Sequence, residues 1–274
     1  MRCIRLRLAY DGTDYDGWQS QKSGRSIQDA VEAATARLIG GKVRVLASGR
    51  TDAGVHAVGQ VAAFRTETAF PPDVIRRALN ARLPDDIIVL AADEAAADFH
   101  PIRDAKQKHY RYLLSDAALP NVFLRRYVWR YPRPLDATAM ERASEVLRGT
   151  HDFSAFQSSG SQRATSVRTI HDLRVGRSRC IPHLITIDVT ANGFLYNMMR
   201  NIVGSLVDVG RGVRPASWIS EVLNGRDRRR AGATAPPHGL FLVSVIYPGS
   251  AAAAPAHDER LPWSGVAHPE FPLV

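Results

Sequence analysis

Short segments of alternating apolar and polar residues run through the first hundred positions, separated by longer segments with helical spacing. Alternation is typical of half-buried strands, and it is found over residues 3–10, 42–47, 59–66 and 86–94. Apolar residues recur every three or four positions over 26–41 and 71–83, which predicts two helices. Ser26 is a candidate N-cap of the first helix and Gly40 a candidate end. The predicted order is strand, helix, strand, strand, helix, strand.

The second half of the chain repeats this order with additional elements. Strand patterns cover residues 108–115, 167–177, 183–191 and 239–247, and helical patterns cover 135–149, 197–212 and 215–225. The order β-α-β-β-α-β is that of ferredoxin-like or RRM-like domains. We therefore expect an α+β fold in which two such halves form an extended, mostly antiparallel sheet, with helices on one face and a basic cleft.

The predicted domain boundaries follow from these patterns. Residues 1–107 form the first ferredoxin-like half, and residues 108–248 form the second. Residues 249–274 show no periodicity, so we expect an irregular C-terminal tail that is poorly ordered or lies along the surface.

The charge of the chain narrows the class of partner. The 274 residues include 36 Lys and Arg against 27 Asp and Glu, a net charge of +9. This excess favours a polyanion such as nucleic acid over a membrane surface, because the sequence has no long apolar run and no basic amphipathic anchor. The N-terminal segment lacks the continuous apolar stretch of a signal peptide, and the two cysteines indicate neither a zinc site nor a disulfide framework. A cytoplasmic, reduced protein is expected.

The most informative segment, residues 49–57, reads GRTDAGVHA and lies between two predicted strands. Gly49 and Gly54 allow a sharp backbone path on either side of Asp52. A carboxylate held in such a loop and kept ionised by Arg50 is a candidate nucleophile or base. From these residues alone, an ordinary Asx turn with a surface ion pair is an equal alternative.

Two residues near Asp52 are expected to support the loop. A lone histidine such as His56 is more often a hydrogen-bonding strut than a general base, and Thr51 is assigned the same supporting role. Before this loop, residues 10–21 read YDGTDYDGWQSQ. The aspartates lack the spacing of a calcium-binding loop, which favours a simple turn, although an aromatic such as Trp18 in a glycine-rich turn is a candidate for lining a cleft.

Two further candidates lie in the second half. Tyr110 and Tyr112 share one face of a predicted strand, with Arg111 opposite. They are either core tyrosines or a stacking platform for a base. Arg200 lies near the start of a predicted helix, where the helix dipole disfavours a cation. It is either a snorkelling surface arginine or the partner of an anion, namely Asp52 or a phosphate.

Taken in order, these motifs closely resemble those of the TruA family of tRNA pseudouridine synthases. The match runs from about Tyr10 to Pro248 and is specific, because one long motif is followed in register by several others. The chain carries YDGT…GWQ, GRTDAGVHA.GQV.F, NA.LP.DI.V, FH…K.Y.Y, HDF.AF, FLYNMMRNIVG and TAP..GL.L..V.YP.

The resemblance implies two ferredoxin-like halves and a homodimer that holds tRNA in basic clefts. It implies conversion of uridine to pseudouridine at tRNA positions 38, 39 and 40, in the anticodon stem-loop, without a metal or organic cofactor. The catalytic aspartate of the family falls on Asp52. The substrate-binding positions fall on Arg50, Tyr110, Arg200 and Leu240.

One position departs from the family pattern, and two other functions stay open. The family often has arginine two residues after the histidine of its FH motif, but here that residue is Ile102 and the arginine is Arg103. Two alternatives follow: the protein backbone is shifted there, or Arg103 reaches the same phosphate from another place. Either would change how firmly the RNA is held, without affecting Asp52. The first alternative function is a non-catalytic RNA-binding module or chaperone. The second is a hydrolase of small glycosides, for which Asp14 or Asp16 would supply a second acid.

Overall fold

The computed structural model describes residues 1–160 and 165–249. These residues form two compact units, which are described separately. The first unit contains residues 1–106 together with 241–249, and the second contains residues 107–240. The predicted tail lies outside the described residues from position 250 onward.

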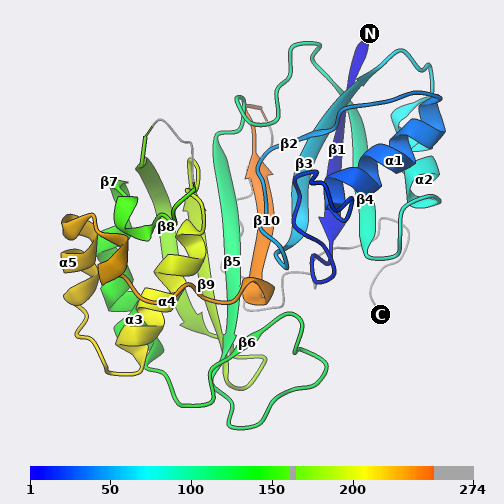
Figure 1. The fold of residues 1–274 in the computed structure, drawn as a ribbon. Coiled ribbons are helices and arrows are strands. Elements are labelled where there is room, and N and C mark those ends of the chain that lie inside the picture. Colours follow the sequence, from blue (N-terminus) through cyan, green and yellow to red (C-terminus); the bar gives the residue numbers. More distant parts are fainter. Residues whose placement is uncertain (161–164, 250–274) are drawn as a thin grey trace. The chain divides into compact units, whose positions relative to one another are not determined.

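The first unit is a small sheet with two helices (Figure 1). Three of its strands are antiparallel neighbours in the order β4-β1-β3, and β10 joins β3 in parallel through Phe241 and His56. The short strand β2 pairs with β3. The elements are β1 (Arg2–Tyr10), α1 (Ile27–Ile39), β2 (Leu46–Ala47), β3 (His56–Thr66), α2 (Pro72–Asn80), β4 (Ile87–Ala95) and β10 (Leu240–Ile246).

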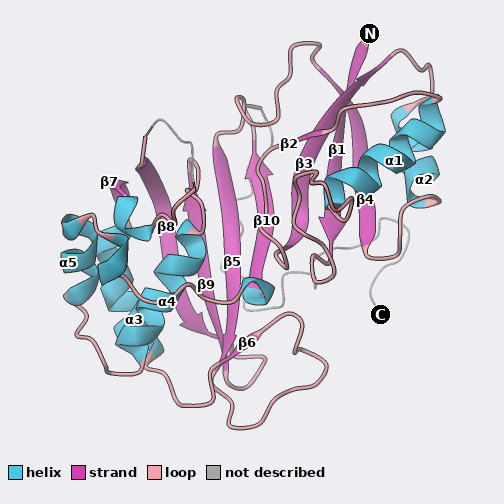
Figure 2. Ribbon diagram, viewed as in Figure 1, coloured by secondary structure: helices cyan, strands magenta, loops and turns pink. Residues whose placement is uncertain are grey.

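The second unit is also a sheet with helices, of which α3 packs against β8 (Figure 2). Its strands run antiparallel in the order β5-β9-β8-β7, and the short β6 pairs with β5 in parallel. The elements are β5 (Gln107–Ser115), β6 (Trp129–Arg130), α3 (Ala137–Ser144), β7 (Gly149–Asp152), β8 (Val167–Arg177), β9 (Leu184–Ala191), α4 (Met198–Gly210) and α5 (Trp218–Gly225).

These elements confirm the predicted fold class. Among the described residues, ten strands in mostly antiparallel pairs combine with five α-helices. The order of the first six elements is the predicted β-α-β-β-α-β. Helix α1 begins and ends as expected: Ser26 Oγ accepts a hydrogen bond from Asp29 N at 3.0 Å, and Gly40 ends the helix with φ of +78°.

Three predicted elements differ from the observed ones. The strand predicted over 42–47 is reduced to Leu46–Ala47, because only these two residues reach β3. The helix predicted over 135–149 ends at Ser144, and Gly149 instead begins the short strand β7. Most of the last strand groups with the first unit, since it pairs with β3. The division into domains at residues 107 and 248 stays a prediction.

Candidate active site

The segment from Ser48 to Val55 connects β2 to β3 and carries the predicted carboxylate. Asp52 is half-buried, and its carbonyl accepts a hydrogen bond from Val55 N at 3.1 Å. Gly54, inside this turn, has φ of +74°, a conformation that glycine adopts without strain. The segment is therefore a tight turn that begins at Asp52 and leads directly into β3.

Two glycines of the preceding segment pack directly against this turn. A Cβ atom on Gly17 would lie 2.5 Å from Thr51 O and 2.9 Å from the carbonyl carbon of Asp52, and one on Gly12 would lie 2.1 Å from Val55 O. Neither position has room for a side chain. The segment that the sequence predicted as a simple turn therefore forms the back wall of the Asp52 loop.

A buried network of neutral groups holds the loop from a second side. The Tyr10 hydroxyl lies 2.9 Å from Thr51 Oγ1, and Gln60 Nε2 donates to Gly49 O at 2.9 Å. The Ser48 hydroxyl donates to Gln60 Oε1 at 2.7 Å. Burial raises the pKa of Tyr10 to about 12, although its hydrogen bonds with Thr51 and Gln60 act in the opposite direction. The network therefore stays uncharged near neutral pH.

His56 is buried where the loop enters β3, and its contacts suit a supporting role. Its Nδ1 accepts a hydrogen bond from Gly12 N at 3.1 Å and lies 3.1 Å from Asp11 Oδ1. Its ring stacks on Phe241, with centroids 4.7 Å apart and planes inclined by 20°. These contacts fix the ring between β10 and the 11–18 segment.

Two further residues of this region, Trp18 and Arg50, were given roles by the sequence. The prediction that Trp18 lines a cleft is wrong, because its side chain is 2% exposed and packs 6.0 Å from the Tyr10 ring, while its backbone N–H donates to Thr51 O. Arg50 is exposed. Its pairing with Asp52 stays a prediction.

The other predicted site residues belong to the second unit. Tyr110 is 7% exposed, and the ring of Phe194 meets it edge-on at 4.8 Å. Arg200 is half-buried at the start of α4; its Nε donates to Ala235 O at 2.7 Å, and its Nη1 donates to Asn197 Oδ1 at 2.9 Å. Leu240 is buried.

A buried ionic cluster occupies the face of β5 opposite to Tyr110. Arg111 is 3% exposed, and its Nε donates to Asp188 Oδ1 on β9 at 2.7 Å. His109 Nε2 lies 2.7 Å from the same oxygen. Burial would raise the pKa of the Asp188 carboxyl, but the hydrogen bond with His109 and the charge of Arg111 hold it below its usual value. The strand that carries Tyr110 is thus fixed to β9 through charged side chains.

The departure from the FH motif also has a structural counterpart. Arg103 Nε donates to Asp104 Oδ1 at 2.8 Å, and Arg103 Nη2 donates to Asp98 O at 2.8 Å. Ile102 is exposed. Arg103 is therefore tied to its own segment, and a contact of its side chain with RNA would have to replace these bonds.

The predicted residues of the first unit lie in the loop before β3 or on the first residue of that strand: Arg50, Thr51, Asp52 and His56. The predicted residues of the second unit lie on β5, α4 and β10: Tyr110, Arg200 and Leu240. Sequence reasoning missed four residues that support the loop: Tyr10, Gly12, Gly17 and Gln60. The sequence held two signals for them. Two glycines stand five positions apart just before a tryptophan, and a glutamine stands inside an apolar strand.

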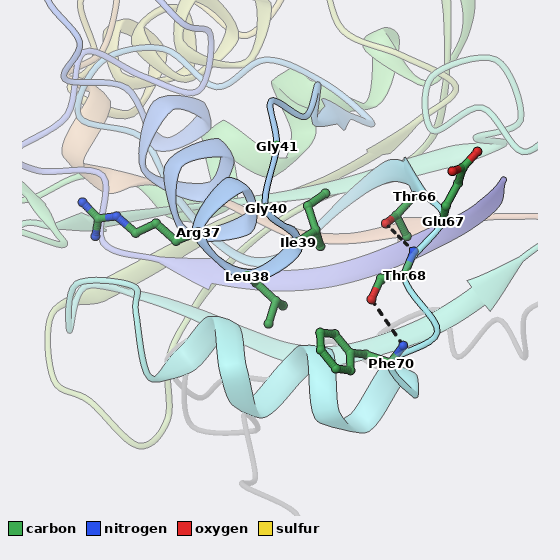
Figure 3. A pocket seen from close by; sticks show the side chains of 9 residues that line it. All are labelled: Arg37, Leu38, Ile39, Gly40, Gly41, Thr66, Glu67, Thr68 and Phe70. Carbon is green, nitrogen blue, oxygen red and sulfur yellow. Dashed lines mark hydrogen bonds between the residues drawn. The ribbon is translucent and has the colours of Figure 1, made fainter.

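A separate hollow lies at the end of α1 and contains none of the predicted site residues (Figure 3). Its volume is about 580 Å³, and its lining includes Arg37, Glu67 and Phe70. Thr68 is another lining residue, and its N–H donates to Thr66 Oγ1 at 3.1 Å. In the described part of the chain, no group of three or more His, Cys, Asp or Glu side chains is placed to hold a metal ion. No helix in residues 1–160 and 165–249 has the length and apolar character needed to cross a bilayer.

Comparison with known proteins identifies the class of protein to which this fold and loop belong. The family model described as tRNA pseudouridine synthase matches residues 8–102 and 143–248. Proteins named tRNA pseudouridine synthase A are similar along most of the chain. The one from Acetivibrio thermocellus is 46% identical over 247 residues, covering 90% of this chain and 100% of the relative.

Two further relatives with this name match the chain to a similar extent. The one from Chloroflexus aurantiacus is 47% identical over 249 residues, covering 90% of each chain, and the one from Myxococcus xanthus is 45% identical over 245 residues, covering 89% of this chain and 91% of the relative. The chain belongs to the tRNA pseudouridine synthase family, whose members are isomerases that convert uridine to pseudouridine in tRNA. The resemblance to the TruA family is thereby confirmed.

Proposed function

We propose that this enzyme isomerises uridine to pseudouridine at positions 38, 39 and 40 of the tRNA anticodon stem-loop, with Asp52 as the catalytic residue and without a cofactor. The observation that carries the proposal is the Asp52 loop itself. A half-buried carboxylate stands at the start of a tight turn, and that turn is backed by Gly12 and Gly17. A rigid support of this kind is what a group acting on one sugar atom requires.

The chemistry requires the target nucleotide to leave the base stack. The bond between C1′ and N1 must break, the base must turn, and a bond between C1′ and C5 must form. The hydrogen on C5 is released to water and N1 gains a proton, so the product is an isomer of the substrate. Since a stacked base cannot turn, we infer that the uridine is flipped out of the helix.

Each predicted residue has a role in this scheme. Asp52 either attacks C1′ or removes a proton from the sugar to give a glycal, and both routes need an ionised carboxylate. Tyr110 and Leu240 pack on the faces of the flipped base. Arg50 and Arg200 hold the RNA backbone through its phosphates.

The glycoside hydrolase alternative is disfavoured by the candidate second acids. A general acid needs a raised pKa to be protonated near neutral pH. The hydrogen bond from Ser23 lowers the pKa of Asp16, and the charge of Arg25 acts in the same direction. Asp14 is exposed. The RNA-chaperone alternative is separated from catalysis by substitution of Asp52, because a chaperone does not need this carboxylate.

We further propose that the enzyme works in the cytoplasm as a homodimer. Cys3 and Cys180 are free thiols, which suits a reducing compartment. The second copy is implied by the family resemblance. Sedimentation velocity at micromolar concentration tests it, since a species of one chain mass would contradict the dimer.

The substrate proposal is tested with tRNA transcripts labelled with tritium at uridine C5. Three transcripts each keep uridine at one of positions 38, 39 and 40 and have cytidine at the other two, and a control transcript has cytidine at all three. The proposal expects tritium release above the control from each of the three. Release that is equal from the control and the test transcripts would place the modified uridine elsewhere in the tRNA.

A further inference from the structure

We propose that Tyr10 and Gln60 are positioning residues for the reaction: through Thr51 and Gly49 they hold the Asp52 loop in the conformation used for catalysis. The proposal deepens the function proposed above and rests on it. Neither side chain is expected to touch the RNA, because both are buried beneath the loop. Their effect on the reaction would pass through the loop alone.

The position of Tyr10 depends on an irregularity in the sheet. Leu8 lies opposite Gln60 in the antiparallel pair of β1 and β3, but the register then shifts so that Tyr10 lies opposite Ala57. A β-bulge of this kind redirects the side chain that follows it. As a result the Tyr10 hydroxyl lies 2.9 Å from Thr51 Oγ1, next to Asp52 in the chain.

The side chain of Gln60 uses its whole hydrogen-bonding capacity on the start of the loop, on Tyr10 and on the backbone of Val61. Its Nε2 donates to Gly49 O at 2.9 Å and to the Tyr10 hydroxyl at 3.4 Å. Its Oε1 accepts from the Ser48 hydroxyl at 2.7 Å and from Val61 N at 3.1 Å. Gln60 thus fixes the first residues of the loop while it orients Tyr10.

The bond between the Tyr10 and Thr51 hydroxyls lies in a buried position. Their oxygens are 2.9 Å apart, and either hydroxyl can donate the hydrogen. Thr51 is 6% exposed, so its hydroxyl is shielded from water that would otherwise replace Tyr10. Removal of the Tyr10 hydroxyl therefore leaves Thr51 without its partner and the Asp52 loop freer to move.

A positioning role and a merely structural role give different kinetics. A displaced carboxylate slows the chemical step, whereas tRNA binding on exposed basic side chains is unaffected. We expect Tyr10→Phe to lower kcat for tritium release roughly 10- to 100-fold. The KM for tRNA is expected to stay within about twofold of wild type.

The test is a double-mutant cycle on kcat, with Tyr10→Phe, Thr51→Val and the pair together. If the two hydroxyls act as one link, the double variant is no slower than the slower single variant. Thr51→Ser, which keeps the hydroxyl, is expected to recover most of the loss seen in Thr51→Val. The control is Thr35→Val, which deletes a buried hydroxyl bonded to Val31 O in the middle of α1 and is expected to leave kcat unchanged.

Three results would overturn the proposal: a wild-type kcat in Tyr10→Phe, a loss equal to that of Thr35→Val, or losses that multiply in the double variant. A wild-type enzyme that releases no tritium would instead contradict the proposed function. Hydrogen–deuterium exchange of residues 48–56 tests the positioning role in that case and in any variant with low activity. Faster exchange in this segment of Tyr10→Phe supports the proposal, and exchange at the wild-type rate rejects it.

Discussion

The loop that carries Asp52 and the strand that carries Tyr110 are held in different ways. Asp52 stands on a turn supported by glycine contacts and by the neutral hydroxyl and amide groups of Tyr10 and Gln60. Tyr110 stands on β5, whose opposite face is tied to β9 by the charged pair Arg111 and Asp188. Both supports are buried, but only the second depends on ionised side chains.

The two kinds of support tolerate different substitutions. Neutral hydrogen bonds change little with salt or with pH near neutrality, so they suit a loop that must keep one shape beside a charged RNA. A buried ion pair depends on both partners, because removing one leaves the other charge without compensation. The strand should therefore be more sensitive to charge changes, and the loop more sensitive to changes of shape.

Breaking the charged support is expected to cost the most stability. Asp188→Asn leaves Arg111 and His109 beside a neutral group and should lower the free energy of unfolding by about 3 kcal/mol. Urea unfolding measures the change. The matched control is Asp172→Asn on the neighbouring strand β8, which removes an exposed pair with Arg174 at 2.9 Å and should cost less than about 1 kcal/mol. Equal losses in the two variants would contradict the importance given to burial.

A change of shape behind the loop is expected to have the next largest effect. Gly17→Ala places a methyl group 2.5 Å from Thr51 O at a φ of +90°, so it should cost roughly 2 kcal/mol and displace Asp52. Gly24→Ala is the control, since its φ is +67° but no atom lies within 4 Å of the added Cβ. The expected cost there is about 1 kcal/mol with full activity. If both variants keep wild-type kcat, the loop does not need this wall.

The pH dependence of stability should show a smaller difference between the regions. The folded pKa of Asp188 is lowered, so its contribution is present above the unfolded value of about 3.9 and is lost as the pH falls through the folded value. Wild type should thus lose stability more steeply than Asp188→Asn below about pH 4. Parallel curves in acid unfolding experiments would show that the carboxyl does not titrate differently in the folded chain.

The elements that the sequence predicted well are those with strong local signals. Helix α1 has a cap at Ser26 and a glycine at position 40, and its bounds are close to those predicted. The strands β6 and β7 were missed because they contain two and four residues and show no alternation. Short strands of this kind form only where a neighbouring strand supplies hydrogen bonds, which local sequence does not reveal.

The same distinction applies to the site. The position of Asp52 between glycines was visible in the sequence, and so was the resemblance that gives it a role. The support was not, because Tyr10 and Gln60 read as ordinary strand positions until the register between β1 and β3 is known. Likewise, Gly17 looks like a turn residue, and only its contact with the backbone of Asp52 shows why no larger residue fits.

Single-turnover release of tritium, with enzyme in excess over bound tRNA, shows whether Asp52 carries out the chemistry. We expect Asp52→Asn to bind tRNA as wild type does but to release tritium roughly 1,000-fold more slowly, a barrier increase of about 4 kcal/mol. Asp14→Asn, which alters an exposed carboxylate of the segment before the loop, should release it at the wild-type rate. Release by Asp52→Asn at the wild-type rate would show that this carboxylate is not the catalytic group.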